Sequence, residues 1–590
     1  MMQFNFYEFR IKSRIFLRKT LLFLAIISII SLIAEYGFYL PQNYIDLNRL
    51  LQKIILYGFL FHTIIKVILY INDLKFLKTH IFEILIALLI LFHISFPSIV
   101  ESIFIFFNPY LSTESITGLY IILSQLLVIF NLIIGGVKYS QKLMVTNIQP
   151  TTLMVISFGI IILLGTLMLL LPKATVNGIS LIDALFTSTS AVCVTGLVVV
   201  DTSTHFTTFG KTIILLLIQI GGLGIMTLTT FIAFVIGNST QLKHYSAIKT
   251  LLGEENIGKI KSVIFIIGLT TFLIEGIGAF SIYNFLDPRL FKHDGERLYY
   301  AIFHSISAFC NAGFSITKDN LADVYLKYNV GLLFTIMFLI ILGGLGFPVL
   351  SNLGKKYLLF KFKNRRIRNL TLHTKLVLVT TFILIIIGTL FFFILEHNKT
   401  LKDYSLPYQI IYSLFHSISA RTAGFNTLDI GSFAYSTMFI LVILMWIGAS
   451  PMSTGGGIKT TTFAVSLLNI YSIASGREKL EMFKRQISDI SITKAFSTVI
   501  LSVSYIALAI FLLLLTENFK FDDILFEVVS AVGTVGLTRG ITPFLSIFGK
   551  IVIIISMFFG RIGLFSIFLI LIREKPKGKY EYAKEDIIIM

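Results

Sequence analysis

Four short segments with related sequences are the residues of this chain best suited to chemistry, and each ends in a glycine followed by Leu or Phe. They are Ser190–Leu197 (SAVCVTGL), Ser307–Phe314 (SAFCNAGF), Ser419–Phe425 (SARTAGF) and Ser530–Leu537 (SAVGTVGL). Glycine adopts positive φ readily and can turn its carbonyl toward an axis without a β-carbon in the way. Carbonyl oxygens aimed at one axis can replace the water around a cation. The segments therefore indicate a cation site built from backbone oxygens.

The spacing of these segments indicates an internal repeat. Gly196, Gly313, Gly424 and Gly536 are separated by 117, 111 and 112 residues, and a near-constant period of this size is typical of a repeated structural unit. A single such glycine has a simpler explanation, because glycine is common in membrane helices. Four copies in phase, each after a short helix, favour one pore lined by four repeats.

The composition is that of a polytopic membrane protein. Hydrophobic residues make up 56% of the chain and charged residues 14%, whereas soluble domains carry about 25% charged residues. The net charge of +18 comes from basic residues between apolar runs, where they set topology, so no nucleic-acid partner is expected. Cys193 and Cys310 lie inside the glycine segments, which argues against a disulfide framework or a metal cage.

Each repeat is expected to contain a long apolar helix, a short amphiphilic helix that ends at the glycine segment, and a second long apolar helix. The first helices are expected near 151–171, 263–284, 376–397 and 494–516; the short helices near 180–191, 297–309, 408–420 and 522–532; the second helices near 210–236, 329–352, 433–470 and 545–573. A helix of about 12 residues is too short to cross a bilayer, so the short helices should enter and return. Their C-terminal ends carry partial negative charge, which favours a cation at the axis.

Further apolar runs precede the first repeat, near 20–40, 52–71, 80–107 and 117–137. The expected fold is an all-α polytopic membrane protein with four membrane-pore-membrane repeats forming one cation pore, preceded by about four extra transmembrane helices. The expected boundaries are 1–150 for the extra helices, 151–240, 255–353, 372–475 and 490–573 for the repeats, and 574–590 for a C-terminal tail. Basic stretches between the repeats place both termini in the cytoplasm, with the chain in the cell inner (plasma) membrane.

The glycine segments resemble the filter segments of the Trk/Ktr/HKT superfamily of potassium transporters, of the TrkH/KtrB-like membrane-subunit type. Further matches are Gln219–Gly224, Gly343–Gly346, Leu372–Lys375 and the run from Gly448 to Thr461. The resemblance implies K⁺ uptake by a homodimer that works with a cytosolic nucleotide-binding subunit of the RCK/KTN type. In that family, glycine in all four repeats goes with K⁺, whereas serine in the first repeat goes with Na⁺.

The resemblance also assigns site residues. The filter would consist of Val194, Thr195, Gly196, Asn311, Ala312, Gly313, Thr422, Ala423, Gly424, Thr534, Val535 and Gly536, with the four glycine carbonyls binding K⁺. The gate would consist of Gly448, Ser450, Ser453, Thr454, Gly455, Gly456, Gly457, Lys459 and Arg561.

The gate residues also carry a physical argument. The run Gly448–Gly457 holds four glycines, a proline and three small polar residues, and it cannot stay regular helix. It resembles the family's intramembrane gating loop; the alternative is a kink needed for packing. Arg561 lies in an apolar run, where a charge costs at least about 2.5–3.5 kcal/mol. It is expected to repel permeating cations and to bond to the loop, unless it reaches the interface by snorkelling.

Several other side chains have weaker assignments. Lys459 serves the gate or only caps helix carbonyls. Arg421 is expected to brace the filter from behind, with Glu527 or Asp429 as its partner. Arg539, just after the fourth glycine, is expected to place a fixed positive charge near the outer mouth and so to hinder cations.

Two aligned histidines and two further functions complete the expectations. His304 and His416 occupy matching positions and are expected to be hydrogen-bonded packing residues rather than metal ligands. The alternative functions are a Na⁺- or H⁺-coupled symporter and a Na⁺-permeable transporter. No enzyme is expected, because no paired carboxylates, metal-ligand cluster or nucleophile with a base recur near membrane depth.

Overall fold

The computed structural model describes residues 6–70, 81–96, 150–224, 257–357, 370–477 and 479–571. This part is almost entirely helical. Its strands are the short pair β1 (Glu481–Met482) and β2 (Arg485–Gln486), which form an antiparallel hairpin after the third repeat. The all-α fold expected from the sequence is confirmed.

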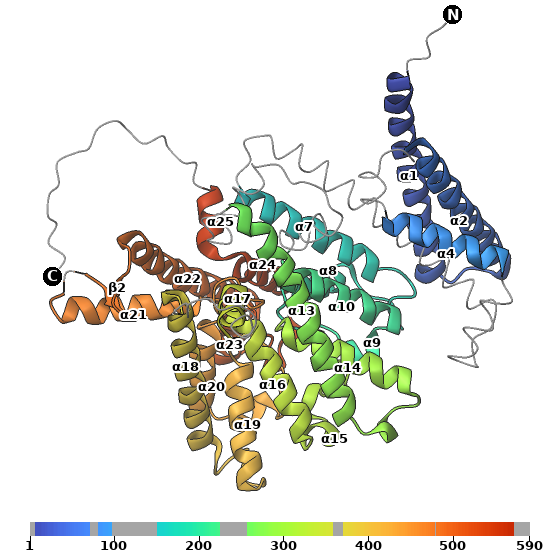
Figure 1. The fold of residues 1–590 in the computed structure, drawn as a ribbon. Helices are drawn as coiled ribbons and strands as arrows, with labels where there is room; N and C mark the ends of the chain where they lie inside the picture. The colour runs from blue at the N-terminus through green and yellow to red at the C-terminus, as the bar shows by residue number, and fades with distance from the viewer. Residues whose placement is uncertain are drawn as a thin grey trace, which may run out of the picture.

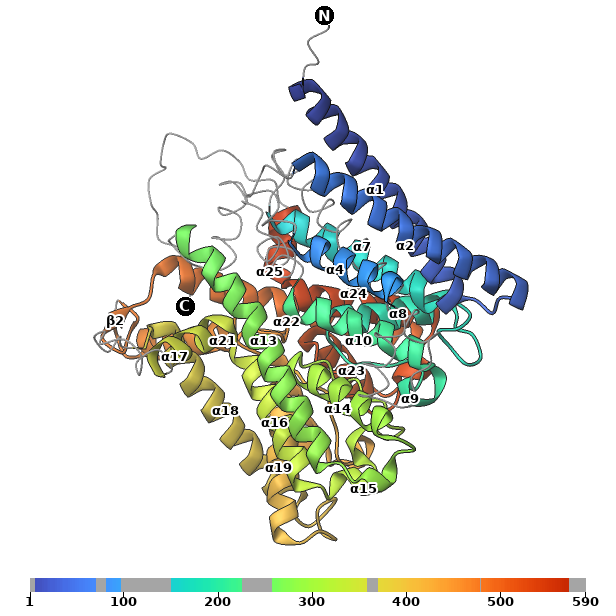
Figure 2. The same cartoon turned by 45° about the vertical axis from the view of Figure 1, so that its right-hand side comes forward.

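An N-terminal bundle precedes the repeats and consists, in the described residues, of α1 (Phe6–Gly37), α2 (Gln42–Tyr70) and α4 (Ile81–Ser95). Its interior is apolar, with Ala25, Phe59 and Ile90 fully buried. The bundle lies beside the first repeat (Figures 1 and 2), and the Lys173 N–H of that repeat donates to the Gly37 carbonyl at 3.0 Å. The expected run at 117–137 lies outside the described residues.

The described residues show the expected order of helices in each repeat. The first helices are α7 (Pro150–Leu169), α13 (Ile257–Phe285), α18 (Leu372–Glu396) and α22 (Asp489–Thr516). The short helices, called pore helices below, are α8 (Leu181–Val192), α14 (Asp294–Phe309), α19 (Leu406–Ser419) and α23 (Phe521–Gly533). The second helices begin as α10 (Thr208–Leu223), α16 (Val330–Leu345), α20 (Tyr435–Trp446) and α24 (Ile547–Ile562).

The pore helices start with an exposed residue and end buried. Acidic residues occupy the first turn of α8, α14 and α23, where they complement the helix dipole. In three repeats a pore-helix serine donates to a carbonyl of the first helix: Ser188 to Ile162 at 2.7 Å, Ser305 to Glu275 at 2.6 Å, and Ser417 to Ile385 at 2.8 Å. These equivalent bonds fix each pore helix against the first helix of its own repeat.

The second helices are not continuous, which corrects the expectation for 210–236, 329–352 and 545–573. α10 ends at Gly224 (φ 74°), α16 at Gly346 (φ 87°) and α24 at Gly563 (φ 93°). Beyond the breaks, α17 (Phe347–Tyr357) and α25 (Leu564–Leu571) turn away by 99° and 94°. Glycine tolerates the left-handed backbone that such a turn requires.

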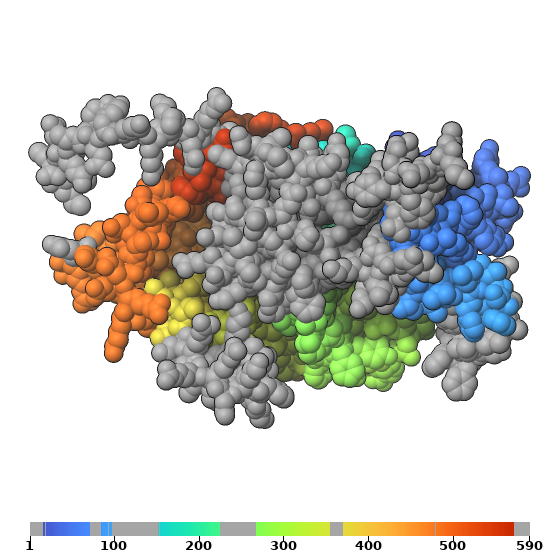
Figure 3. All heavy atoms as spheres, turned by 45° about the horizontal axis from the view of Figure 1, so that its top comes forward, coloured from blue at the N-terminus to red at the C-terminus, as the bar shows by residue number. Residues whose placement is uncertain are grey.

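The third repeat has a longer interruption, at the position expected from the sequence. Its second helix resumes as α21 (Thr460–Ala474) after the irregular segment 447–459, of which residues 448–457 are called the gate loop below. The α21–β2 region and the N-terminal bundle lie at opposite ends of the molecule (Figure 3).

The described helices fit a membrane protein. Four are long and apolar enough to cross a bilayer, and the number among the described residues rises to six when each bent pair counts as one span. The chain is therefore a multi-pass membrane protein.

Candidate functional site

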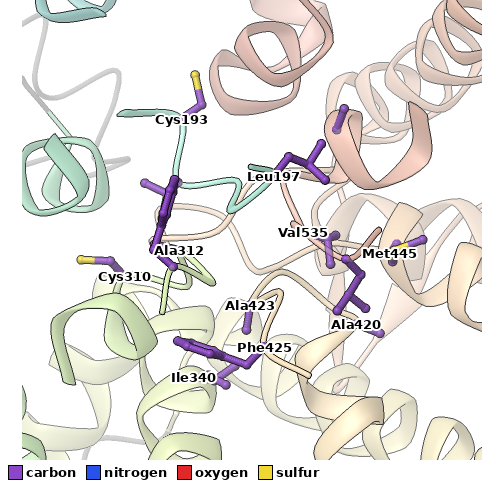
Figure 4. Packing of buried hydrophobic residues seen from close by; sticks show 14 of the residues in the cluster. Cys193, Leu197, Cys310, Ala312, Ile340, Ala420, Ala423, Phe425, Met445 and Val535 are labelled. Atoms are coloured by element: carbon purple, nitrogen blue, oxygen red, sulfur yellow. The ribbon is translucent and has the colours of Figure 1, made fainter. Parts of the chain in front are cut away.

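The four glycines of the repeated segments form a closed ring. An ideal β-carbon on Gly196 would overlap the Ala312 carbonyl oxygen, one on Gly313 would lie 2.6 Å from the Ala423 oxygen, and one on Gly424 would overlap the Val535 oxygen. The ring closes because a β-carbon on Gly536 would overlap the Thr195 oxygen. Figure 4 shows the four segments converging on one centre.

Each glycine of the ring has a backbone that requires glycine. The φ angles are 89° at Gly196, 67° at Gly313, 76° at Gly424 and 93° at Gly536. A side chain at any of them would be strained by its own φ and would also clash with the next repeat. A salt bridge of 2.7 Å between Lys550 of α24 and Asp183 of α8 further ties the fourth repeat to the first.

Three filter residues other than glycine also have positive φ. They are Val194 (58°), Asn311 (59°) and Thr534 (50°), each two residues before its glycine. Such a conformation costs about 1–3 kcal/mol and is typical of functional sites. The third repeat has one residue fewer between its serine and its glycine, and none of its residues has a positive φ before Gly424.

The first serine of each segment holds the glycine region in place. The Gly196 and Gly536 N–H groups donate to the Ser190 and Ser530 hydroxyls, both at 3.1 Å. Ser307 donates to the Phe314 carbonyl at 2.7 Å, and Ser419 donates to the Phe425 carbonyl at 2.5 Å. No role was expected for these serines, although their recurrence at one position was a usable signal.

A second support comes from the pore-helix position three residues before that serine. His304 Nε2 lies 2.9 Å from Ser315 Oγ, and His416 Nε2 lies 3.2 Å from Thr427 Oγ1. In the fourth repeat Glu527 occupies this position and accepts hydrogen bonds from Thr538 at 2.7 Å and Thr542 at 2.5 Å. All three side chains hold the chain that leaves the filter, a role that was not expected for Glu527.

The gate loop packs directly against the filter. The Thr454 N–H donates to the Gly343 carbonyl at 3.2 Å, and Thr454 Oγ1 lies 3.2 Å from the Asn311 side-chain amide. The Gly456 N–H donates to Thr534 Oγ1 at 2.9 Å. An ideal β-carbon on Gly455 would lie 2.8 Å from Thr422 Oγ1. The loop therefore contacts the filter segments of repeats two, three and four.

The remaining gate residues lie around the root of the loop. Ser450 is fully buried, and its backbone N–H donates to the Gly344 carbonyl at 3.1 Å. Ser453 Oγ lies 3.5 Å from the Gly455 carbonyl. Gly448 and Gly457 are so close that a β-carbon on Gly448 would lie 3.0 Å from the Gly457 Cα. The two ends of the loop thus meet.

Arg561 connects this loop to the first repeat. Its guanidinium donates to the carbonyls of Thr454 and Gly221, and it lies 3.5 Å from the Gly222 carbonyl. These contacts with backbone carbonyls agree with the expected bond to the loop rather than with snorkelling. Lys459 Nζ donates to the Gly455 carbonyl at 2.8 Å, within the loop and not in a helix.

The expected partners of Arg421 were wrong. Its Nη2 lies 3.5 Å from the Gly448 carbonyl at the start of the gate loop. Glu527 is occupied by Thr538 and Thr542, and Asp429 caps the turn at Gly431. The reason is position, because Arg421 follows the C-terminal end of its pore helix while Glu527 lies on the body of a different one.

The expectation for Arg539 is also corrected. The guanidinium lies 2.7 Å from Asp522 and 3.1 Å from Asp523, in the first turn of α23. Two carboxylates therefore neutralise the charge that was expected to be fixed near the pore mouth. Arg539 ties the chain after the fourth glycine to the start of its own pore helix.

Comparison with known proteins gives consistent results. Residues 123–583 match the family described as "TrkH: Cation transport protein". The chain is similar to the Ktr system potassium uptake protein B of Bacillus subtilis (strain 168), with 42% identity over 416 residues, which is 70% of this chain and 91% of the relative.

A second relative and a solved structure extend the comparison. The chain is 35% identical to the potassium/sodium uptake protein NtpJ of Enterococcus hirae over 454 residues, 75% of this chain and 98% of that one. Its fold is similar to the crystal structure of the potassium transporter TrkH from Vibrio parahaemolyticus, with a TM-score of 0.59 and 17% identity over 72% of this chain and 86% of that one.

Proposed function

Because this chain belongs to the TrkH family of cation transport proteins, we propose that it takes up K⁺ across the plasma membrane along the axis of the glycine ring. The family and the similar proteins are transporters, not enzymes. The observation that carries the proposal is the closed contact of Gly196, Gly313, Gly424 and Gly536 with the carbonyls of the neighbouring repeats.

The chemistry of this ring suits a dehydrated monovalent cation. The carbonyls that meet at the ring belong to Thr195, Ala312, Ala423 and Val535. Non-helical backbone is tolerated at membrane depth only where it is buried in protein or lines a water-filled cavity. The four pore helices end at the same ring, so their partial negative charges also favour a cation. The names of similar proteins, such as the potassium uptake protein B of Bacillus subtilis, agree with K⁺.

The proposed gate is the loop 448–457, which lies against three filter segments and is held by Arg561. Withdrawal of the loop would open the axis.

We assign the repeats to residues 151–240, 255–353, 372–475 and 490–573, after extra helices in 1–150 and before a cytoplasmic tail at 574–590. We further propose a homodimer with both termini in the cytoplasm and a cytosolic nucleotide-binding subunit of the RCK/KTN type. The "system" in the name of the Bacillus subtilis relative supports a multi-subunit assembly.

Growth of cells that lack their own K⁺ uptake tests the proposal. At limiting external K⁺, the wild-type chain with its cytosolic partner should restore growth, and Gly313→Ser should abolish it or make the cells leak Na⁺. A β-carbon at Gly313 would lie 2.6 Å from the Ala423 carbonyl oxygen, and the φ of Gly313 is 67°. Gly295→Ser is a matched control in the same repeat, because a β-carbon there meets only His293 at 3.5 Å. Equal growth of both variants would contradict the placement of the filter.

A Na⁺-permeable or Na⁺-coupled transporter is the second candidate, supported by the potassium/sodium name of the Enterococcus hirae relative. Rb⁺ influx into proteoliposomes separates the two mechanisms. A K⁺ pathway should carry Rb⁺ down its own gradient without Na⁺. Influx that depends on a Na⁺ gradient would favour the coupled transporter.

A further inference from the structure

Glu275 is a buried acidic residue of α13 that neither the filter nor the gate loop includes. Glu275 is only 5% exposed. It forms no ion pair with the cations of the described part of the chain. Acidic side chains at membrane depth are costly, and they usually serve a function that repays this cost.

The carboxylate of Glu275 joins two repeats. Gln219 Nε2, on α10 of the first repeat, donates to both carboxylate oxygens at 3.1 and 3.2 Å. Cys310 Sγ, at the end of pore helix α14, lies 3.9 Å from Oε1. Ser305 of the same pore helix donates to the Glu275 backbone carbonyl at 2.6 Å. Glu275 therefore fixes the last turn of α10 relative to α14.

Both of these contacts lead to the gate loop. Gln219 lies two residues before Gly221, whose carbonyl accepts a hydrogen bond from Arg561. On the other side, Cys310 precedes Asn311, whose amide lies 3.2 Å from Thr454 Oγ1. The two sides are in direct contact, because a β-carbon on Gly222 would overlap Cys310 Sγ.

We propose that Glu275 is a positioning residue for the closed gate, an inference that rests on the proposed function. By holding Gln219, its carboxylate keeps the Gly221 and Gly222 carbonyls within reach of Arg561. Arg561 in turn holds the Thr454 carbonyl and, through it, the gate loop. Loss of the carboxylate frees the last turn of α10, weakens the hold of Arg561 and lets the loop leave the axis more often.

The test is Rb⁺ influx into proteoliposomes that contain the full-length protein. Glu275→Gln keeps the size of the side chain but replaces one acceptor oxygen by a donor, so Gln219 can no longer donate to both sides. Loss of this hydrogen bond should raise influx by up to about tenfold. Gln219→Leu should have the same effect. The influx of the double variant should exceed that of neither single variant, because both changes remove the same contact between Gln219 and Glu275.

Glu396→Gln is the matched control. Glu396 is also a fully buried carboxylate on the first helix of a repeat, and it accepts hydrogen bonds from the Ala434 N–H at 3.0 Å and Thr437 Oγ1 at 2.5 Å. Glu396 ends α18, and these partners lie at the start of α20, not at the gate loop. This variant should lower the melting temperature and leave Rb⁺ influx at the wild-type level. An equal rise of influx in Glu396→Gln would show a general loosening and would overturn the proposal.

Deletion of residues 450–456 in the same assay separates this inference from the proposed function. If the deletion raises influx while folded Glu275→Gln and Gln219→Leu do not, Glu275 has no part in the gate and the transport proposal stands. If the deletion leaves influx unchanged, the loop is no gate and the role of Glu275 fails with it. A rise in the deletion and in both point variants, without a change in K⁺ over Na⁺ preference, supports the proposal.

Discussion

At the scale of single residues, the serine near the end of each pore helix fixes the backbone of the filter. Ser190 and Ser530 accept from the N–H of the ring glycine, whereas Ser307 and Ser419 donate to the carbonyl of the residue after it. A hydroxyl both donates and accepts, so one residue type supports two backbone geometries. The serines therefore matter for where the carbonyls point.

Replacing Ser190 by alanine should reduce the preference for K⁺ over Na⁺. The Gly196 N–H would be left buried without an acceptor, at a cost of about 1–3 kcal/mol, and the first filter segment would relax. Ser188→Ala is the control, since Ser188 is equally buried on the same helix but bonds to the Ile162 carbonyl, away from the filter. Both variants should have a lower melting temperature. The inhibition of Rb⁺ influx by competing Na⁺ should change in Ser190→Ala alone.

The sequence predicted which residues lie at the ring but not how they meet. Gly196, Gly313, Gly424 and Gly536 were identified from their spacing, because the repeat places equivalent residues at equivalent positions. The partners of Arg421 and Arg539 were not, since each depends on side-chain directions between elements distant in sequence. The pairing of Arg539 with Asp522 and Asp523 had only a weak signal in the two acidic residues that open α23.

At the scale of elements, the breaks in the second helices give the gate loop its place. α16 ends at Gly346, and the Phe347 N–H that follows donates to the Met452 carbonyl of the loop at 3.1 Å. A β-carbon on Gly346 would lie 2.6 Å from the Pro451 oxygen. Carbonyls of the loop therefore lie directly against the point where α16 ends. The break and the loop are therefore parts of one arrangement.

Gly346→Ala should therefore disturb the loop and raise Rb⁺ influx. The new methyl group would push against the Pro451 carbonyl, and the φ of 87° would add strain of about 1–2 kcal/mol. Gly476→Ala is the control for strain alone, because Gly476 has a φ of 67° and open space around its β-carbon position. Higher influx in Gly346→Ala with unchanged influx in Gly476→Ala is the expected result. Equal influx in the two variants would mean that the contact with Pro451 does not hold the loop.

Element boundaries were predicted well where the pattern was local. The short helices expected at 180–191 and 522–532 run at 181–192 and 521–533, because each has an acidic residue in its first turn and ends at a glycine segment. The breaks at Gly224, Gly346 and Gly563 were missed, because a glycine inside a long apolar run is also compatible with continuous helix. The interruption was predicted only in the third repeat, from its proline and four glycines.

At the scale of the whole molecule, the N-terminal bundle is attached to the first repeat through Lys173. The Lys173 Nζ donates to the Glu35 carbonyl at 2.5 Å and lies 5.7 Å from the centre of the Tyr39 ring. The Lys173 carbonyl in turn accepts from Thr207 Oγ1 at 2.6 Å, and Thr207 caps the start of α10. The family match begins at residue 123, so α1, α2 and α4 lie outside the matched region.

The place of this bundle can be tested by a disulfide. A β-carbon on Gly37 would lie 3.0 Å from the Leu171 side chain, so Gly37→Cys combined with Leu171→Cys should crosslink on oxidation. The native Cys193 and Cys310 are fully buried, so they should contribute little background.

Adding Lys173→Met should lower the crosslink yield by removing the bond to Glu35. Rb⁺ influx should not fall, since Lys173 lies outside the filter and the gate. A crosslink that is absent in the folded double variant would place the bundle elsewhere, and lost influx in Lys173→Met would instead make this attachment part of the transport mechanism.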